Sequence, residues 1–319
     1  MFKKAILFIL AAVLMLSLAA CGGNGDSNAP TGGGNNAPAT TQGATPGTAT
    51  TPDATTQGAT PDATTTPAPE PTPVFSENVN FSFWIYGDVR ITIIAYLGGA
   101  SEVEIPAEIN GVPVTEIGNG AFADNRNITS VTIPDSVTRI GQRAFADCRN
   151  LASVTMGSGV TEIGGVAFYR TGITSIVLPD GLTAIGEQAF MGTGLTSIII
   201  PDSVESIGNS AFNIRSLTSV TLGNGVESIG ASAFHDAEIE SITIPASVTF
   251  IGNSAFGTAL GRHLDLYFEG LPPRIDGTLV AISTRPGPGD AGGNTFSIFH
   301  RAGTEGWSNP WHGMPTETF

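Results

Sequence analysis

The sequence predicts a repeat solenoid: a right-handed stack of 22- to 23-residue rungs, with short parallel β-strands on one face and short strands with 3₁₀ or helical turns on the other. The first observation behind this prediction is that IGNSAF occurs at 207–212 and again at 251–256. The second is that Ile-Gly-x-x-Ala-Phe recurs seven times between residues 117 and 256, with steps of 22 or 23 residues. The third is that Leu-x-Ser-Val-x-Ile-Pro, or a close variant, runs between these motifs.

The Leu-x-Ser-Val-x-Ile-Pro pattern predicts a short strand with one buried face. In one rung, Val131 and Ile133 alternate with Ser130 and Thr132. A period of two with β-branched residues is typical of a half-buried strand. Pro134 ends this strand, and the Asp-Ser or Asp-Gly that follows the proline in several rungs is turn chemistry.

The Ile-Gly-x-x-Ala-Phe pattern predicts a corner followed by a buried ring. Glycine suits a backbone corner where a Cβ atom would be unwelcome, and Ala-Phe is expected on a short helical or 3₁₀ turn. One rung has too few apolar side chains to offset the entropy lost in ordering its backbone, so neighbouring rungs must share their buried faces. The seven rings are therefore expected to form one spine: Phe122, Phe145, Phe168, Phe190, Phe212, Phe234 and Phe256.

These rungs resemble the BspA-like leucine-rich repeats of bacterial surface proteins. Residues 114–256 match the pattern Leu-x-x-Val-x-Ile-Pro-x-x-Val-x-x-Ile-Gly-x-x-Ala-Phe with few departures. Residues 91–114 resemble the opening module of that family, and 267–273 with 296–319 resemble its closing module. The resemblance implies a leucine-rich-repeat-like solenoid, and it implies adhesion to host extracellular proteins or to other cells.

The chain departs from the family pattern in two respects. Gly157 and Gly223 stand where other rungs have proline, and two extra residues lie between Phe256 and the strand expected near 266–268. The expected organisation is a signal peptide with a lipobox at 1–21, a disordered Thr/Pro/Ala/Gly-rich tether at 22–73, an N-terminal capping module at 74–113, the repeat solenoid at 114–270 and a C-terminal capping segment at 271–319.

The N-terminal 21 residues are typical of a targeting segment. Lys3 and Lys4 form a basic region, and residues 5–18 form an apolar stretch that is short for a membrane span. The ending Leu-Ala-Ala-Cys resembles a bacterial lipobox, in which the Cys21 thiol takes a diacylglyceryl group and the freed amine is usually acylated. Two or more acyl chains make a stable membrane anchor. The alternative is an ordinary signal peptide that happens to be followed by a cysteine.

The next segment, residues 22–73, predicts a tether. It is rich in Gly, Ala, Asn, Thr and Pro, it repeats TTQGATP at 40–46 and 55–61, and it has no large apolar residue before Val74. Such a composition cannot bury a core. As a flexible coil it would span roughly 40 Å, and as polyproline II about 160 Å. A glycosylated, mucin-like stalk is an alternative that leaves the spacer role unchanged.

The charge balance excludes one class of partner. Both lysines leave with the signal peptide, so 11 arginines face 28 acidic residues, a net charge of 11 − 28 = −17. Nucleic-acid binding depends on clustered Lys and Arg that neutralise phosphates, and no such cluster is present in the sequence. The chain is therefore expected to bind no nucleic acid and to reach a membrane only through its lipid anchor.

The sequence has no pattern typical of an enzyme or a metal site. Its four histidines form no His-x-x-x-His pair with an acidic residue between, and Gly-x-Ser-x-Gly is absent. Acidic residues such as Asp135, Asp202 and Glu205 recur at the rung period, which is typical of turns and surfaces and not of a single catalytic pair. We expect no enzymatic activity, no metal and no cofactor.

Two groups of residues each leave an alternative open. Cys148 has no cysteine partner once Cys21 carries lipid, so it is either a small buried residue or an exposed reactive thiol. Trp307 and Trp311 either cover the open C-terminal end of the solenoid or form a platform for a sugar. We favour the buried cysteine and the cap, and we expect Trp84 and its aromatic neighbours to cover the front end in the same way.

The strands also predict a candidate binding face. Strand side chains alternate, so the residue between the two inward positions of each rung must point outward. These outward residues are Glu104, Thr132, Thr155, Val177, Ile199, Thr221 and Thr243. A serine lies two positions earlier in six of these rungs, so the face is paved with hydroxyls. Val177 and Ile199 form an apolar centre, which is either an interface or two ordinary β formers.

The residues and the resemblance together predict an extracytoplasmic, membrane-anchored lipoprotein at a bacterial cell surface. Its leucine-rich repeat domain is expected to be a monomer that binds a protein or cell-surface ligand in adhesion. Two alternatives are a non-catalytic structural spacer of the envelope and a carbohydrate-capture module.

Overall fold

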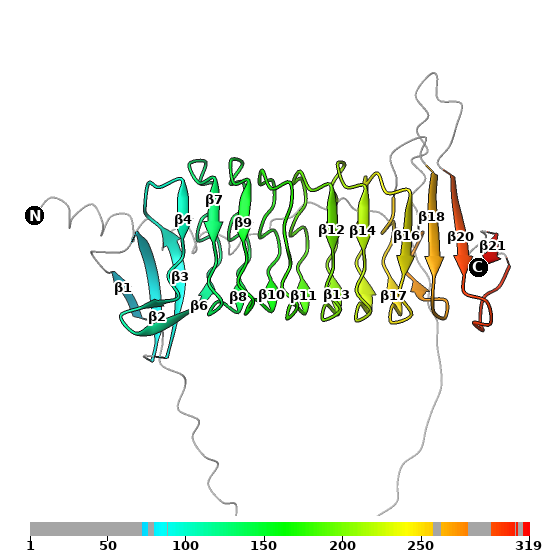
Figure 1. Cartoon of the computed structure of the whole chain (residues 1–319), viewed down its shortest axis with the longest axis horizontal. Helices are drawn as coiled ribbons and strands as arrows, with labels where there is room; N and C mark the ends of the chain where they lie inside the picture. The colour runs from blue at the N-terminus through cyan, green and yellow to red at the C-terminus, as the bar shows by residue number, and fades with distance from the viewer. Residues whose placement is uncertain are drawn as a thin grey trace, which may run out of the picture. The chain divides into compact units, whose positions relative to one another are not determined.

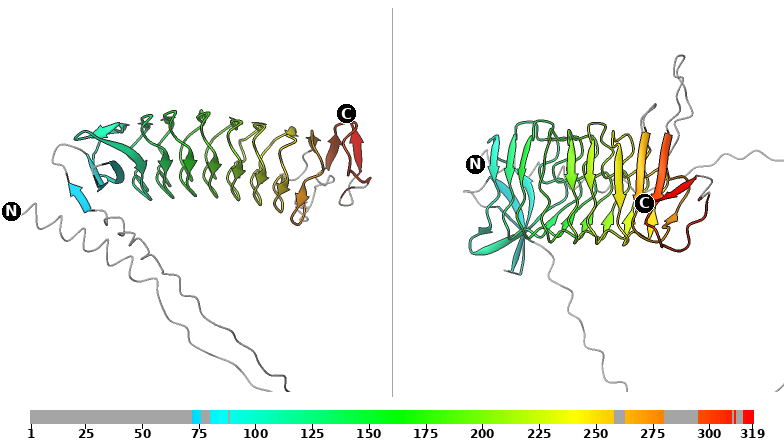
Figure 2. Two further views of the ribbon diagram at one scale, coloured as in Figure 1. Left: turned by 90° about the horizontal axis from the view of Figure 1, so that it is seen from below. Right: turned by 45° about the vertical axis from the view of Figure 1, so that its right-hand side comes forward.

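The computed structural model describes residues 72–75, 80–87, 89–257, 263–279, 295–309, 311 and 315–319. The signal peptide, Cys21 and nearly all of the tether expected from the sequence lie outside the described residues. Those described belong to one compact unit, residues 65–319. In this unit the rungs stack side by side as parallel loops (Figures 1 and 2). No helix in the described ranges is long and apolar enough to cross a membrane.

One side of the rungs forms a twelve-stranded sheet, which we call the continuous sheet. Its order is β1-β2-β3-β6-β8-β10-β11-β13-β15-β17-β19, with β5 paired to β6. The strands are β1 (Thr72–Phe75), β2 (Phe81–Tyr86), β3 (Arg90–Tyr96), β5 (Glu108–Ile109), β6 (Val112–Ile117), β8 (Arg139–Ile140), β10 (Glu162–Ile163), β11 (Ala184–Ile185), β13 (Ser206–Ile207), β15 (Ser228–Ile229), β17 (Phe250–Ile251) and β19 (Arg274–Ile275).

The other side carries a second set of parallel strands, which we call the interrupted face. They form three separate sheets, β4-β7-β9, β12-β14 and β16-β18-β20-β21. The strands are β4 (Glu102–Glu104), β7 (Ser130–Thr132), β9 (Ser153–Thr155), β12 (Ser197–Ile199), β14 (Ser219–Thr221), β16 (Ser241–Ile244), β18 (His263–Phe268), β20 (Thr295–His300) and β21 (Thr316–Thr318). The expectation of parallel strands on one face and short strands on the other is thus confirmed.

The Ile-Gly step explains why the continuous sheet has no break. Ile163 of β10 pairs in parallel with Ile140 of β8 and with Ile185 of β11, and all three side chains are buried. A Cβ atom on Gly164 would lie 2.8 Å from the backbone nitrogen of Gln142 in the preceding rung. Because a real Cβ atom does not come that close to backbone, glycine at this corner lets the rungs pack at the spacing of a sheet.

The Ala-Phe segments are hydrogen-bonded turns, and the 3₁₀ or helical geometry expected for them is not confirmed. The described residues contain no helix of either kind. Arg143 and Asp147 have φ values of 58° and 57°, and such left-handed residues on both sides of Phe145 cannot continue a right-handed helix. The backbone N–H groups of Arg143 and Phe145 instead donate to Gly165 O and Ala167 O of the next rung, at 2.9 and 2.8 Å. The N–H groups of Ala144 and Ala146 stay within the rung and donate to Gly141 O and Arg143 O, at 3.2 and 3.1 Å. The turn thus divides its hydrogen bonds between its own rung and the next one.

The phenylalanine spine predicted from the sequence is confirmed. All seven rings are buried, and neighbouring ring centroids lie 4.7–5.6 Å apart with planes inclined by 4–22°. Tyr96 stacks on Phe122 at 5.3 Å, and Phe81 contacts both rings, so the N-terminal strands continue the spine. Offset stacking of buried rings is favourable beyond the area that they bury. The spine lies between the two faces and supports both.

Candidate binding face

The structure places all seven predicted outward residues on the exposed surface of the interrupted face. Val177 and Ile199 are the most exposed apolar members, at 84% and 71%. The seven residues do not share one sheet. Glu104, Thr132 and Thr155 belong to β4-β7-β9, Ile199 and Thr221 to β12-β14, and Thr243 to β16, while the rung of Val177 has no strand on this face.

The interrupted face breaks in two places. One break lies between β9 and β12, where residues 173–178 form no strand and Figure 1 shows no arrow. The other lies between β14 and β16, which belong to different sheets. The sequence pattern placed these rungs in one strand face paved with hydroxyls and interrupted by Val177 and Ile199, whereas the structure divides the strands of that face among three sheets.

The corner residue that follows each strand explains the position of the breaks. Along the interrupted face the corners read Pro106, Pro134, Gly157, Pro179, Pro201, Gly223 and Pro245. The step from a proline rung to a glycine rung keeps its ladder, as in β7-β9 and β12-β14. The step from a glycine rung to the following proline rung loses its ladder, after β9 and again after β14. Both breaks therefore begin at a glycine that replaces proline.

The glycine corners lie close to the backbone of the rung before them. A Cβ atom on Gly157 would overlap the carbonyl of Pro134 and lie 2.7 Å from Asp135 N. A Cβ atom on Gly223 would lie 2.6 Å from Asp202 N. Proline could not occupy these positions at this distance, and it also lacks a backbone N–H for a ladder.

An aspartate clamps each glycine corner to the rung before it. Asp135 Oδ1 accepts hydrogen bonds from the backbone N–H of Ser158 at 2.7 Å and from the Ser158 hydroxyl at 3.0 Å. These two hydrogen bonds lower the pKa of Asp135. Asp202 Oδ1 accepts hydrogen bonds from Asn224 N at 2.7 Å and Asn224 Nδ2 at 3.3 Å. The two aspartates predicted as turn residues thus hold the corners that open the face.

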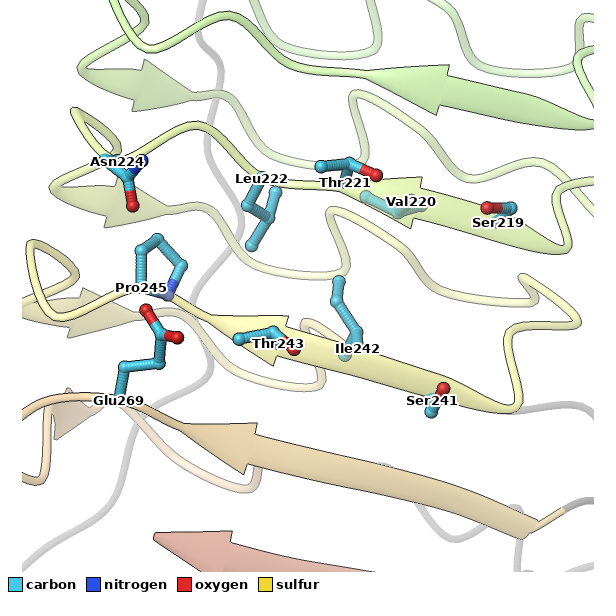
Figure 3. A pocket seen from close by; sticks show the side chains of 10 residues that line it. All are labelled: Ser219, Val220, Thr221, Leu222, Asn224, Ser241, Ile242, Thr243, Pro245 and Glu269. Atoms are coloured by element: carbon cyan, nitrogen blue, oxygen red, sulfur yellow. The ribbon is translucent and has the colours of Figure 1, made fainter. Parts of the chain in front are cut away.

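The second break forms a crevice of about 440 Å³. Its lining is Ser219, Val220, Thr221, Leu222, Asn224, Ser241, Ile242, Thr243, Pro245 and Glu269. Figure 3 shows Leu222 and Ile242 between the ribbons of β14 and β16, with the Glu269 carboxylate beside Pro245. Core side chains are less covered here than on the paired strand before it. Val220 and Leu222 are 8% and 9% exposed, whereas Ile198 and Ile200 are 3% and 1% exposed.

Cys148 and the histidines show no catalytic arrangement in the described part of the chain. Cys148 is fully buried, its thiol donates to Phe122 O at 3.0 Å, and burial raises its pKa to about 12. A thiolate is required for reactivity, so this cysteine is the small buried residue favoured above. His235 and His263 each contact one carboxylate, Asp236 and Asp265. Among the described residues, no three His, Cys, Asp or Glu side chains come together as a metal site.

The C-terminal tryptophans pack against the end of the core. Trp311 is buried, and the rings of Trp307 and Trp311 lie 5.1 and 5.6 Å from Phe268. Trp307 also stacks on His300 at 5.0 Å and donates its Nε1–H to Gly270 O at 3.1 Å. Trp311 is buried and cannot be a sugar platform, and the packing of the half-buried Trp307 on the core favours the capping role for the pair.

Sequence reasoning missed the crevice between β14 and β16. The available signal was the pair of departures at Gly157 and Gly223, which the repeat pattern identifies by position. Glu269 could not be assigned to this site from the rung period, because β18 pairs with β16 at an offset of 24 residues instead of 22. The two extra residues noted in the sequence account for that offset.

Comparison with known proteins gives a consistent result. The BspA type leucine rich repeat region matches residues 115–191 and 160–260, with six copies. The crystal structure of a T. pallidum leucine rich repeat protein (TpLRR) is 32% identical, with a TM-score of 0.52, and the match covers 54% of this chain and 84% of that chain. A leucine-rich repeat protein from Bacteroides capillosus ATCC 29799 is 30% identical over 47% of this chain and 97% of that chain, with a TM-score of 0.34. No curated protein matches this chain.

Proposed function

This chain belongs to the BspA-type leucine-rich repeat family, and on that premise we propose that it is a surface-anchored lipoprotein whose solenoid binds a protein ligand and thereby attaches cells. Leucine-rich repeat domains generally bind proteins, and the family is a repeat scaffold that is typically non-catalytic. The proposal assigns the binding to the interrupted face.

The observation that carries this proposal is the apolar centre of that face. Val177 and Ile199 expose most of their side chains, and they lie among exposed hydroxyl residues on a surface whose other strands carry Ser and Thr. Interfaces are commonly built with a small apolar centre inside a polar surround. Two side chains form a small patch, so each contact would be weak, and attachment would depend on many anchored copies that act together.

The test adds charge to the apolar centre. Val177→Asp with Ile199→Asp should abolish the attachment of cells that display the chain to a surface coated with host extracellular-matrix proteins. The melting temperature should change by a few degrees at most, because both side chains are exposed. Thr132→Asp with Thr155→Asp is the matched control, since it adds the same charge to exposed residues of the same face.

Attachment by the Val177/Ile199 variant at the level of the control, in a folded protein, would contradict the assignment of the site. Failure of the unmodified chain to support any attachment would favour the structural-spacer alternative. Binding to a glycan array with no binding to proteins would favour the carbohydrate-capture alternative.

The lipid anchor is a separate part of the proposal. Cys21→Ser should leave an unprocessed precursor that takes up no labelled fatty acid, because the thiol is the proposed acylation site. Labelled fatty acid in this variant at the level of the unmodified chain would contradict the anchor. The segment concerned lies outside the described residues, and the experiment is independent of the binding face.

A further inference from the structure

The crevice between β14 and β16 is a gap in the hydrogen-bond ladder. One step earlier, the Ile200 N–H group donates to Thr221 O at 2.9 Å, and the equivalent Ile133 N–H donates to Thr155 O at the same distance. Leu222 occupies the position of Ile200 one rung later, and its N–H faces β16 by the symmetry of the repeat. No ladder joins β14 to β16 in the described residues. Polar backbone at this gap is therefore open to a ligand.

Three kinds of group line the crevice, and they are arranged in layers. At the mouth are four exposed hydroxyl residues, two from each strand: Ser219, Thr221, Ser241 and Thr243. The floor consists of apolar side chains, including Leu222 and Ile242. At one end stands Glu269, which follows β18 and whose carboxylate projects to Pro245 (Figure 3).

The charge and shape of the lining indicate a positively charged side chain with an apolar stem. Glu269 is the only charged residue among the ten that line the crevice, and the hydroxyl oxygens add neutral acceptors around it. A long aliphatic stem can lie on an apolar floor while its charged end reaches polar groups. None of the ten lining residues is aromatic, which disfavours a sugar or a quaternary ammonium ion, because both are usually bound against aromatic rings.

Lysine fits this arrangement better than arginine. An ammonium group has three donors around a compact charge, whereas a guanidinium is a planar fork that matches acceptors lying in one plane. The acceptors here come from two strands and from Glu269, and thus from several directions. We propose that the crevice between β14 and β16 binds a lysine side chain of the protein partner. This inference rests on the proposed function, because the lysine belongs to the protein that the interrupted face would bind.

A methyl-detected NMR titration tests the proposal on the full chain in mild detergent. The probes are the peptides acetyl-Gly-Lys-Gly-amide and acetyl-Gly-norleucine-Gly-amide, which differ in the ammonium group. The lysine peptide should shift the methyl signals of Val220, Leu222 and Ile242. It should leave unmoved the signals of Val131, in the paired strand β7, and of Ile133, which follows that strand. The norleucine peptide should bind more weakly, because it has no charge for Glu269.

A conservative variant tests whether the carboxylate of Glu269 binds the ammonium group of the lysine peptide. Glu269→Gln keeps the shape of the side chain and removes its charge. It should lower the affinity for the lysine peptide by about three- to tenfold, as expected for the loss of a partly exposed, hydrogen-bonded ion pair. Glu108→Gln is the matched control, because Glu108 is an exposed carboxylate on β5 of the continuous sheet, outside the proposed binding face. This control should bind the lysine peptide like the unmodified chain.

Equal binding of the two peptides, or equal binding by Glu269→Gln and Glu108→Gln, would overturn the proposal. So would a cello- or chito-oligosaccharide that shifts the same methyl signals when the lysine peptide does not. The titration uses no cells, so its failure is distinct from a failure of cell attachment. Attachment without lysine binding would leave the proposed function standing, and lysine binding without attachment would leave the crevice assignment standing.

Discussion

The two faces of this solenoid are built from the same rungs, yet one sheet is continuous and the other is broken twice. On the continuous sheet, every rung from β8 to β17 presents the same Ile-Gly step, and parallel pairing runs through all of them. On the interrupted face the corner is glycine at Gly157 and Gly223 and proline in the five other rungs from 106 to 245, and pairing stops after each glycine rung. The two faces therefore differ in whether the corner residue is the same from rung to rung.

Both faces keep their buried residues constant and vary the residues beside them. On the continuous sheet an isoleucine is buried in every rung, while the partly exposed residue before it changes from Glu116 and Arg139 to Ser228 and Phe250. The interrupted face has exposed positions that change along the stack, from Glu104 through threonines to Val177 and Ile199. This variation is tolerated because the buried isoleucines and the phenylalanine spine hold the stack together. Three predictions test how the buried and closely packed residues do so.

The largest effect is expected from the spine, which both faces share. Phe190→Ala should lower the free energy of unfolding by about 3–5 kcal/mol, because the ring is fully buried between two others at 5.3 Å and leaves a cavity. Phe256→Ala should cost less, since in the described part of the chain Phe256 stacks on one ring, Phe234, at 5.6 Å. Urea denaturation measures both, and near-zero shifts for both variants would contradict a shared spine.

A smaller effect is expected at the glycine corners of the interrupted face. Gly223→Ala should destabilise the chain by about 1–3 kcal/mol, because its Cβ atom would press on the backbone of Pro201 and Asp202. The matched control is Gly181→Ala in a proline rung, where the nearest atom, Ser158 O, lies 3.7 Å from the added Cβ atom. Thermal denaturation compares the two variants. An equal loss in both would show that the close approach at Gly223 does not set the spacing.

The smallest effect concerns Cys148, which lies between the spine and β9. Burial raises the pKa of its thiol from 9.0 to about 12, so between these pH values the unfolded chain releases a proton that the folded chain keeps. Stability is therefore fully present below pH 9 and is lost as the pH rises through this window. From pH 8 to pH 10, the unmodified chain should lose about 1.4 kcal/mol more than Cys148→Ala does.

Urea denaturation at the two pH values measures this difference, and the comparison with the variant cancels the titration of the tyrosines. An identical pH dependence of the unmodified chain and Cys148→Ala would mean that the thiol ionises as easily in the folded chain as in the unfolded chain. Water would then reach the Cys148 thiol in the folded chain.

The sequence by itself determined the repeat, its period, the phenylalanine spine and the direction in which each strand side chain points. These features follow from local rules, because alternation along a strand and the recurrence of Ile-Gly do not depend on how closely two rungs approach. The family could be inferred for the same reason, since the family pattern is a pattern of side chains within one rung.

Only the tertiary structure decided where the interrupted face breaks and what lines the crevice. The break depends on contacts between residues about 22 positions apart, such as Asp202 with Asn224. Such contacts join two neighbouring rungs, so the sequence of one rung does not reveal their effect. The turns likewise do not extend into helices, because every second N–H group, such as those of Arg143 and Phe145, donates to the neighbouring rung. Glu269 lies beside the crevice because β18 pairs with β16 at an offset of 24 residues, and the pairing is a property of two strands together and not of one strand.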